Sequence, residues 1–324
     1  MNKNSIRKIG SSAMKKSTGI AMILIILVLG IRAPLFFQVS NLLTVLKQSG
    51  ILCMTAISIT TVLIVGGFDM GAGAAVQLAC NLAAGLIITY NHAGFSWIAG
   101  IGIGLLFGII NASLVVFLHI PTFVTTLGTM YLMNGLTALY NQGSTLAIKD
   151  MGYFTKLTQG SLLGIPIIFI IVMVTCLILH YFFKHTRTGL RMYACGENKA
   201  AASLHGIKIS KYMFLGYIMS GTLLGFTGVL QCSYNYGASA VDYGMDFLVK
   251  ALASAYLGST FSKTGELSMI GTVISGVFIA ALSNILIING FSNQIVSGVL
   301  GAVLILSILL TVIKTRKIGQ VTIF

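Results

Sequence analysis

The run KHTRTGLRMYACGENKAAASLHGIKISK, residues 184–211, is the longest strongly polar stretch in a chain that is otherwise mostly apolar. It predicts a short helix at its centre: Asn198 can act as N-cap, Lys199–His205 propagate a helix, and Gly206 suits the position after its end. A helix of about two turns is too short to be stable alone in water. We therefore expect residues 184–211, called the platform below, to present a helix that docks against a partner.

The composition indicates a membrane protein. The 324 residues are 56% hydrophobic and 8% charged, whereas a soluble domain carries about 25% charged residues. This predicts an all-α polytopic membrane protein. The net charge of +14 is explained by cationic residues that gather on the cytoplasmic side of a membrane. No basic cluster interleaves with aromatic residues in a polar segment, so we exclude nucleic acid as a partner.

Apolar runs of about 20 residues, the length needed to cross a bilayer, predict about ten transmembrane helices. The eighth is short, and the glycine-rich segment near residues 66–73 predicts a broken helix. No small-residue cleavage site follows the first run, so we expect the first span to be retained. The predicted spans lie near residues 18–36, 42–65, 71–90, 96–118, 121–140, 163–183, 212–233, 246–260, 267–288 and 294–313.

The distribution of Lys and Arg predicts the orientation. Placing the N-terminus in the cytoplasm puts most of these residues on the inner face, as the positive-inside rule requires. The chain is thus predicted to be one transmembrane domain, 1–324, with residues 1–17, the platform and residues 314–324 in the cytoplasm. The platform alone carries six of the twenty Lys and Arg residues: Lys184, Arg187, Arg191, Lys199, Lys208 and Lys211.

The sequence contains no enzyme constellation. The patterns HExxH and GxSxG are missing, and the run Ser262-Lys263-Thr264 lacks the glycines of a phosphate-binding loop. The five cysteines are scattered and indicate neither a disulfide framework nor a metal site. We expect a chain that is not an enzyme and binds no cofactor of its own.

Two intramembrane features are candidates for a translocation path. The run Gly66–Gly73 holds four glycines and Asp69, which either caps the following helix or contacts the substrate. Residues 121–130 hold four Thr, which either satisfy backbone groups or line a polar path for a hydroxylated ligand. Acidic residues are nearly absent from the spans, which disfavours an ion-coupled carrier. The candidate path residues are Gly67, Asp69, Phe123, Thr125, Thr126 and Asn134.

Small residues at four-residue spacing predict close helix packing, either within the chain or between subunits. Two outer segments, near residues 141–162 and 234–245, are rich in Gly, Ser, Asn and Tyr. Each is either a hydrated connection or a docking surface for an outside partner. The small-residue positions are Gly100, Gly104 and Gly108, Gly221 and Gly225, Gly271 and Ser275, and Ser297 and Gly301.

Four motifs in order carry a resemblance: GGFDMGAGA from Gly66, PTFVTTLGTMYLMNGLT from Pro121, TRTGLRMYACGENKAAASLHGIKIS from Thr186, and ALASAYLGST from Ala251. The chain resembles the membrane subunit of ribose-type ABC importers, the permease family that serves ribose, other simple sugars, autoinducer-2 and some nucleosides. The resemblance runs from about residue 36 to about residue 310. Departures at Phe247–Lys250 and Gly258-Ser259 concern the substrate more than the architecture.

The resemblance implies that the platform helix is a coupling helix that sits in a groove of a cytoplasmic ATP-binding subunit. ATP and magnesium would then be bound by that subunit. It also implies an extracytoplasmic solute-binding protein, a second permease copy that is identical or paralogous, and a location in the lipid bilayer of the inner (plasma) membrane. The implied coupling residues are Gly196, Glu197, Asn198, Ala200, Ala201, Gly206 and Ile207.

The expected function is that of the permease subunit of an ATP-driven importer for a ribose-like sugar or another monosaccharide. Two alternatives remain open at this point. The same architecture could import autoinducer-2, a nucleoside or branched-chain amino acids, or the chain could work alone as a secondary carrier.

Overall fold

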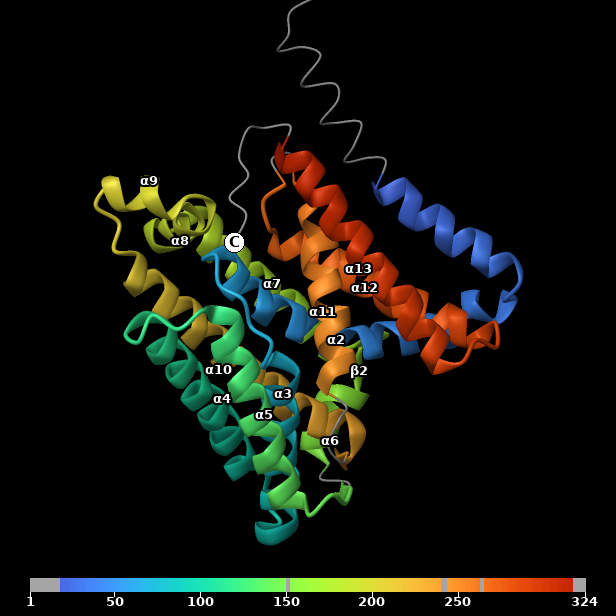
Figure 1. Ribbon diagram of the computed structural model, residues 1–324. Helices are drawn as coiled ribbons and strands as arrows, with labels where there is room; N and C mark the ends of the chain where they lie inside the picture. The colour runs from blue at the N-terminus through green and yellow to red at the C-terminus, as the bar shows by residue number, and fades with distance from the viewer. Residues whose placement is uncertain (1–17, 150–151, 240–243, 263–264, 317–324) are drawn as a thin grey trace, which may run out of the picture.

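The computed structural model describes residues 18–149, 152–239, 244–262 and 265–316. The predicted cytoplasmic segment 1–17 and most of the predicted tail lie outside these ranges. The described chain is almost wholly helical (Figure 1). Its helices are an N-terminal helix Thr18–Ile31, the 3-10 helix η1 (Pro34–Phe37), α2 (Val39–Ile64), α3 (Ala72–Tyr90), α4 (Ala93–Val116), α5 (Thr122–Asn141), α6 (Tyr153–Gln159), α7 (Ile167–His185), α8 (Arg187–Glu197), α9 (Lys199–Leu204), α10 (Ile209–Asn235), α11 (Gly244–Ser259), α12 (Met269–Ile288) and α13 (Asn293–Arg316).

Seven described helices are long and apolar enough to cross a membrane: α2, α3, α4, α7, α10, α12 and α13. The other three predicted spans are also helical but do not meet that measure. The N-terminal helix and α11 are too short, and α5 is rich in Thr and Asn. The predicted first span, 18–36, was too long, because the helix ends at Ile31 and Pro34 opens a separate 3-10 turn.

The predicted broken helix is present. Helix α2 ends at Ile64 and α3 begins at Ala72, and the chain between them is non-helical. Gly66 has φ +75°, a left-handed conformation that glycine adopts without steric cost. We call residues 65–71 the break.

The platform and the longest loops lie at opposite ends of the long helices: in Figure 1, α8 and α9 lie at the upper left, and α6 lies well below them. The two segments predicted to be outer loops meet: β1 (Leu146–Ala147) pairs with β4 (Gly237–Ala238). A hairpin of β2 (Ser161–Leu162) and β3 (Ile165–Pro166) precedes α7, and Leu163 at its tip is 97% exposed. The end opposite the platform therefore carries a small structured cap, defined here as residues 144–149, 152–166 and 236–239.

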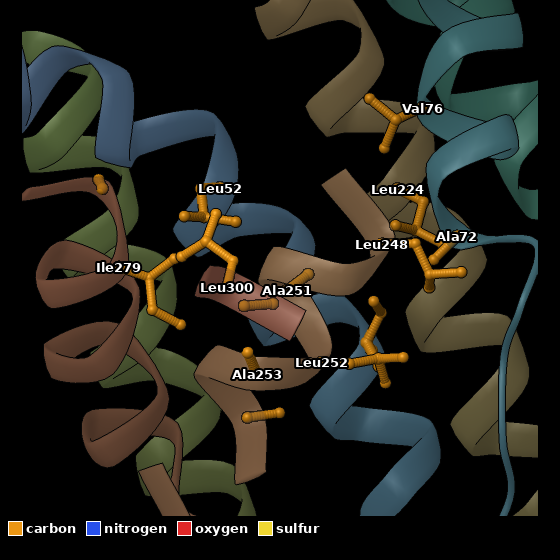
Figure 2. Packing of buried hydrophobic residues seen from close by; sticks show 14 of the residues in the cluster. Leu52, Ala72, Val76, Leu224, Leu248, Ala251, Leu252, Ala253, Ile279 and Leu300 are labelled. Atoms are coloured by element: carbon orange, nitrogen blue, oxygen red, sulfur yellow. The ribbon is translucent and has the colours of Figure 1, made fainter. Parts of the chain in front are cut away.

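Helix α11 lies in the middle of the largest hydrophobic core. Leu248, Ala251 and Ala253 are buried against residues of α2, α3, α10, α12 and α13, as Figure 2 shows. A helix enclosed by protein need not cover the whole bilayer with its own apolar surface, because neighbouring helices shield it from lipid. This explains why the eighth predicted span is only 16 residues long.

Two sets of the regularly spaced small residues bring helices of this chain into close contact with each other. Helices α4 and α10 cross so closely that a Cβ on Gly104 would overlap the carbonyl oxygen of Gly221, and the reverse is also true. Gly258 and Gly271 bring α11 and α12 together in the same way. Gly301 on α13, by contrast, has open space around it.

Gly104→Ala is expected to destabilise the protein by about 1–3 kcal/mol, the usual cost of overpacking a tight interface. The readout is the midpoint of thermal unfolding in detergent, together with abundance in the membrane. Gly102→Ala on the same helix is the matched control, because a Cβ there meets nothing within 4 Å. Equal unfolding midpoints for the two variants would contradict the close α4–α10 crossing.

Candidate functional site

The platform folds into two short helices with side-chain caps. Helix α8 begins after Thr186, whose hydroxyl accepts a hydrogen bond from the Gly189 N–H at 3.0 Å. Helix α9 begins after Asn198, whose Oδ1 accepts from the Ala201 N–H at 2.9 Å, and Gly206 follows its end with φ +74°. The predicted cap at Asn198 and the predicted role of Gly206 are confirmed. Helix α8 was not predicted, although Thr186 was a readable N-cap signal.

Helix α9 presents an apolar face to the outside. Ala202 is buried and faces the platform, whereas Ala200, Ala201 and Leu204 are exposed, Leu204 at 88%. Leu204 lies four residues after Ala200 and therefore on the same face of the helix. Sequence reasoning missed Leu204 as a functional candidate. An exposed leucine and two alanines on a two-turn helix form a small apolar surface suited to a groove.

The base of the platform rests on the break. A Cβ on Gly196 would overlap the carbonyl oxygen of Ile64, the last residue of α2, and the Gly66 N–H lies on the same side. Ile207 is half-buried and packs onto a cluster that includes Ile64 and Met192. Of the predicted coupling residues, Gly196 and Ile207 thus join the platform to the bundle, while Ala200 and Ala201 face outward.

A second contact joins the platform to the segment that precedes α12. The Tyr193 hydroxyl donates to the carbonyl oxygen of Leu267 at 2.6 Å, and Lys184 Nζ lies 3.2 Å from a Glu266 carboxylate oxygen. Lys184 also sits 5.0 Å from the centre of the Tyr193 ring. Partial burial raises the pKa of the Glu197 carboxyl, as does the nearby Glu266 carboxylate, while Lys184 lowers it. The platform is therefore anchored beside both α2 and α12.

Hydrogen bonds from two helices hold the break in place. The Met70 N–H donates to Thr126 Oγ1 at 3.0 Å, and the Tyr217 hydroxyl donates to the Phe68 carbonyl at 3.0 Å. Asp69 is buried, and its Oδ1 accepts from the Gly71 N–H at 2.9 Å, just before α3 begins. The sequence left a structural role or a substrate contact open for Asp69 and for the Thr residues of α5. The contacts seen here are structural, because the side chains of Asp69 and Thr126 each accept a hydrogen bond from a backbone N–H.

Three of the predicted path residues lie beside a small cavity in the described part of the chain. Gly67, Asp69 and Thr126 lie together at the break, but the cavity beside Asp69 has a volume of about 10 Å³. That volume holds a water molecule at most. Phe123 is exposed, with its ring 6.1 Å from that of Phe68, and Asn134 lies two turns further along α5.

A much larger cavity lies in the half of the bundle away from the platform. Its volume is about 430 Å³, and none of the predicted path residues lines it. It is surrounded by α2, α10, α11, α12 and α13. The described polar residues that line it are Gln48, Gln231, Tyr234, Asn235, Asp246, Lys250, Ser283, Asn284, Asn293 and Ser297.

One feature of this cavity, a pair of oppositely charged residues, could have been found in the sequence. Asp246 and Lys250 are spaced four residues apart in a predicted span and form an ion pair on α11. Ionisable residues inside a membrane are costly, so a pair of opposite sign marks a candidate functional site. The contribution of Gln231 and Asn284 could not be read in advance, because it depends on which helices meet.

Comparison with known proteins identifies the family. A family model described as "Branched-chain amino acid transport system / permease component" matches residues 41–308. The chain belongs to this permease family. The seven apolar helices and the family together show a multi-pass protein of the inner membrane.

Several named permeases are similar to this one over most of their length. The ribose import permease protein of Escherichia coli K12 is 27% identical over 299 residues, which cover 91% of this chain and 93% of the relative. The ribose import permease protein of Bacillus subtilis is 30% identical over 292 residues, 90% of each chain. The autoinducer 2 import system permease protein of Photorhabdus temperata is 29% identical over 300 residues, 89% of this chain and 88% of the relative.

Thr126→Val is expected to destabilise the permease by about 1–3 kcal/mol, because it leaves the partly buried Met70 N–H without its acceptor. Thr125→Val is the matched neighbour. Thr125 is also buried, but its Oγ1 has no hydrogen-bond partner in the described parts of the chain, so the change is expected to be neutral or stabilising. The measurement is thermal unfolding of the two purified variants, and equal effects would contradict the assigned role of Thr126.

Proposed function

We propose that this chain is the permease subunit of an ATP-driven importer that carries a simple sugar across the inner membrane. The named relatives support an importer of this type, since two are ribose import permeases and one is an autoinducer 2 import permease. The whole chain acts as one transmembrane domain with its platform and both termini in the cytoplasm. ATP and magnesium are bound by a partner subunit.

The observation that carries the proposal is the contact between the platform and the break. The apolar face of α9, formed by Ala200, Ala201 and Leu204, is the docking surface for the ATP-binding subunit. Movement of α9 is passed to α8 through the capped turn at Asn198. Because Gly196 touches the end of α2 without an intervening side chain, α8 and α2 cannot move independently at this point.

The other partners follow from the opposite end of the molecule. The cap of residues 144–149, 152–166 and 236–239 is the docking surface for an extracytoplasmic binding protein, and the exposed side chains of Tyr153 and Leu163 supply its apolar contacts. A second permease copy, identical or paralogous, completes the transporter. ATP binding closes the two ATP-binding subunits, the platforms follow, and the spans alternate between outward and inward openings.

Ala201→Glu in α9 is expected to reduce uptake roughly tenfold or more, because docking would bury an unpaired carboxylate. The assay is uptake of radiolabelled D-ribose in cells that also express the ATP-binding subunit and the binding protein, with membrane abundance measured in parallel. Ser210→Glu is the control: it adds the same charge to the platform but lies in the first turn of α10, where a negative charge is tolerated. Gly196→Arg would be a poorer test, since its side chain would disrupt the contact with Ile64.

Uptake by Ala201→Glu equal to that of the unmodified protein, at equal abundance, would contradict docking through α9. The alternative of a stand-alone carrier is tested with the purified permease in liposomes. Uptake driven by an ion gradient without any ATP-binding subunit would overturn the proposal.

A further inference from the structure

The 430 Å³ cavity has the size and the lining of a solute site. At roughly 30 Å³ per water molecule, its volume equals about 14 waters, which leaves room for a solute of about ten to twelve non-hydrogen atoms. It lies between five helices in the half of the bundle away from the platform. The cavity beside Asp69 at the break, by comparison, has a volume of about 10 Å³.

Gln231 gives this cavity an unused hydrogen-bond acceptor. The side chain is 3% exposed, and its Oε1 is buried with no hydrogen-bond partner in the part of the chain that the structure describes. A buried acceptor without a partner costs about 1–3 kcal/mol. A rotation of this side chain toward the cavity that it lines would let a donor on a bound molecule reach the oxygen and recover that energy, so Gln231 points to a ligand that carries hydroxyl or amino groups.

The ion pair between Asp246 and Lys250 favours a ligand that carries no charge. They are the charged members of the described lining, and their side chains form a direct ion pair, with the Ser297 hydroxyl 3.4 Å from the second Asp246 oxygen. An anion would meet no unmatched cation here. A zwitterion would have to separate the pair to satisfy its own two charges. Neutral hydroxyl groups can donate to the carboxylate and accept from the ammonium while the pair stays intact.

The rest of the lining fits the same kind of molecule. Asn284 accepts a hydrogen bond from Asn41 through its Oδ1, and its NH₂ group is a further donor. Tyr234 and Phe247 add aromatic surface beside the polar groups. A pocket with a few directed polar groups and an apolar wall suits a ring that has hydroxyls at its rim and C–H groups on its face.

We infer that this cavity binds a neutral polyhydroxylated solute of the size of a pentose or hexose, recognised by Gln231, Asp246 and Lys250. The inference rests on the proposed function and assigns its substrate class to residues inside one permease chain. It also separates a sugar from a branched-chain amino acid, because the latter is a zwitterion.

Protection of an introduced thiol tests the site without requiring transport. Ser297→Cys in the full-length permease places a thiol at the cavity, and Ser292→Cys places one at an exposed position just before α13 that does not line it. The five native cysteines are buried and give a low background. In membrane vesicles, D-ribose at ten times its Kd is expected to slow alkylation of Ser297→Cys by about tenfold. The rate for Ser292→Cys is expected to stay unchanged.

The recognition residues are tested in the same background. Adding Gln231→Leu is expected to abolish protection by D-ribose while the unprotected alkylation rate stays the same. The leucine should not unfold the protein, because it replaces a buried polar atom that has no partner. Ser283→Cys, which also lines the cavity, provides a second thiol if Ser297→Cys does not reach the membrane.

The outcomes distinguish this inference from the proposed function. Protection by D-ribose and ribitol, but not by L-leucine, supports a neutral polyol site. Protection by L-leucine alone, or by none of the three at concentrations up to 100-fold above those used for uptake, would overturn it. Loss of ATP-driven uptake in Ala201→Glu with ribose protection intact would separate the solute site from the coupling surface.

Discussion

Every backbone N–H and C=O group inside a bilayer needs a partner within the protein, and this requirement organises the whole chain. Long helices meet it for most residues. In the break between α2 and α3, helical hydrogen bonds no longer satisfy the backbone. Side chains from three parts of the chain supply the missing partners there: Asp69, Thr126 and Tyr217. A non-helical segment at this depth persists because α5 and α10 pack against it.

The break in turn supports the platform. Gly196 sits directly on the carbonyl oxygen at the end of α2, and Tyr193 bonds to the backbone just before α12. Neither contact relies on a long flexible side chain alone, and the ion pair between Lys184 and Glu266 adds little because both groups are partly exposed. The platform is therefore held by close packing and backbone hydrogen bonds, which transmit displacement better than a solvated charge pair.

Much of this architecture could be predicted from the sequence, because its signals are local. Hydropathy located the long spans, glycines located the break, and Asn198 with Gly206 marked the ends of α9. Two predicted spans are helical but are too polar or too short for a typical membrane-crossing helix, and their surroundings explain why. Helix α11 is short because protein surrounds it, and α5 is polar because Thr126 and Thr129 bond to the break and to Asn111.

The candidate solute site was less predictable for the same reason. The sequence left two roles open for the Thr residues of 121–130, satisfying backbone groups or lining a polar path, and it named Asn134 as a further path candidate. In the folded chain Thr126 serves the backbone, and Asn134 lies away from the break. The cavity instead draws Gln48, Gln231 and Asn284 from three helices that are far apart in sequence. Such a site is created by helix packing, and only the Asp246–Lys250 pair carried a local signal of it.

The proposed coupling surface and the proposed solute site are joined by helices that reach both. Helix α2 touches Gly196 at Ile64 and lines the cavity at Leu52, which is 12 residues or about 18 Å away along the axis. Helix α12 begins beside the Tyr193 contact and lines the cavity at Ser283, about 21 Å further along. Because each helix is a stiff, continuously hydrogen-bonded rod, a shift of α2 relative to α12 at the platform would also change the spacing of the cavity walls. The proposed coupling surface and the proposed solute site therefore need no separate relay between them.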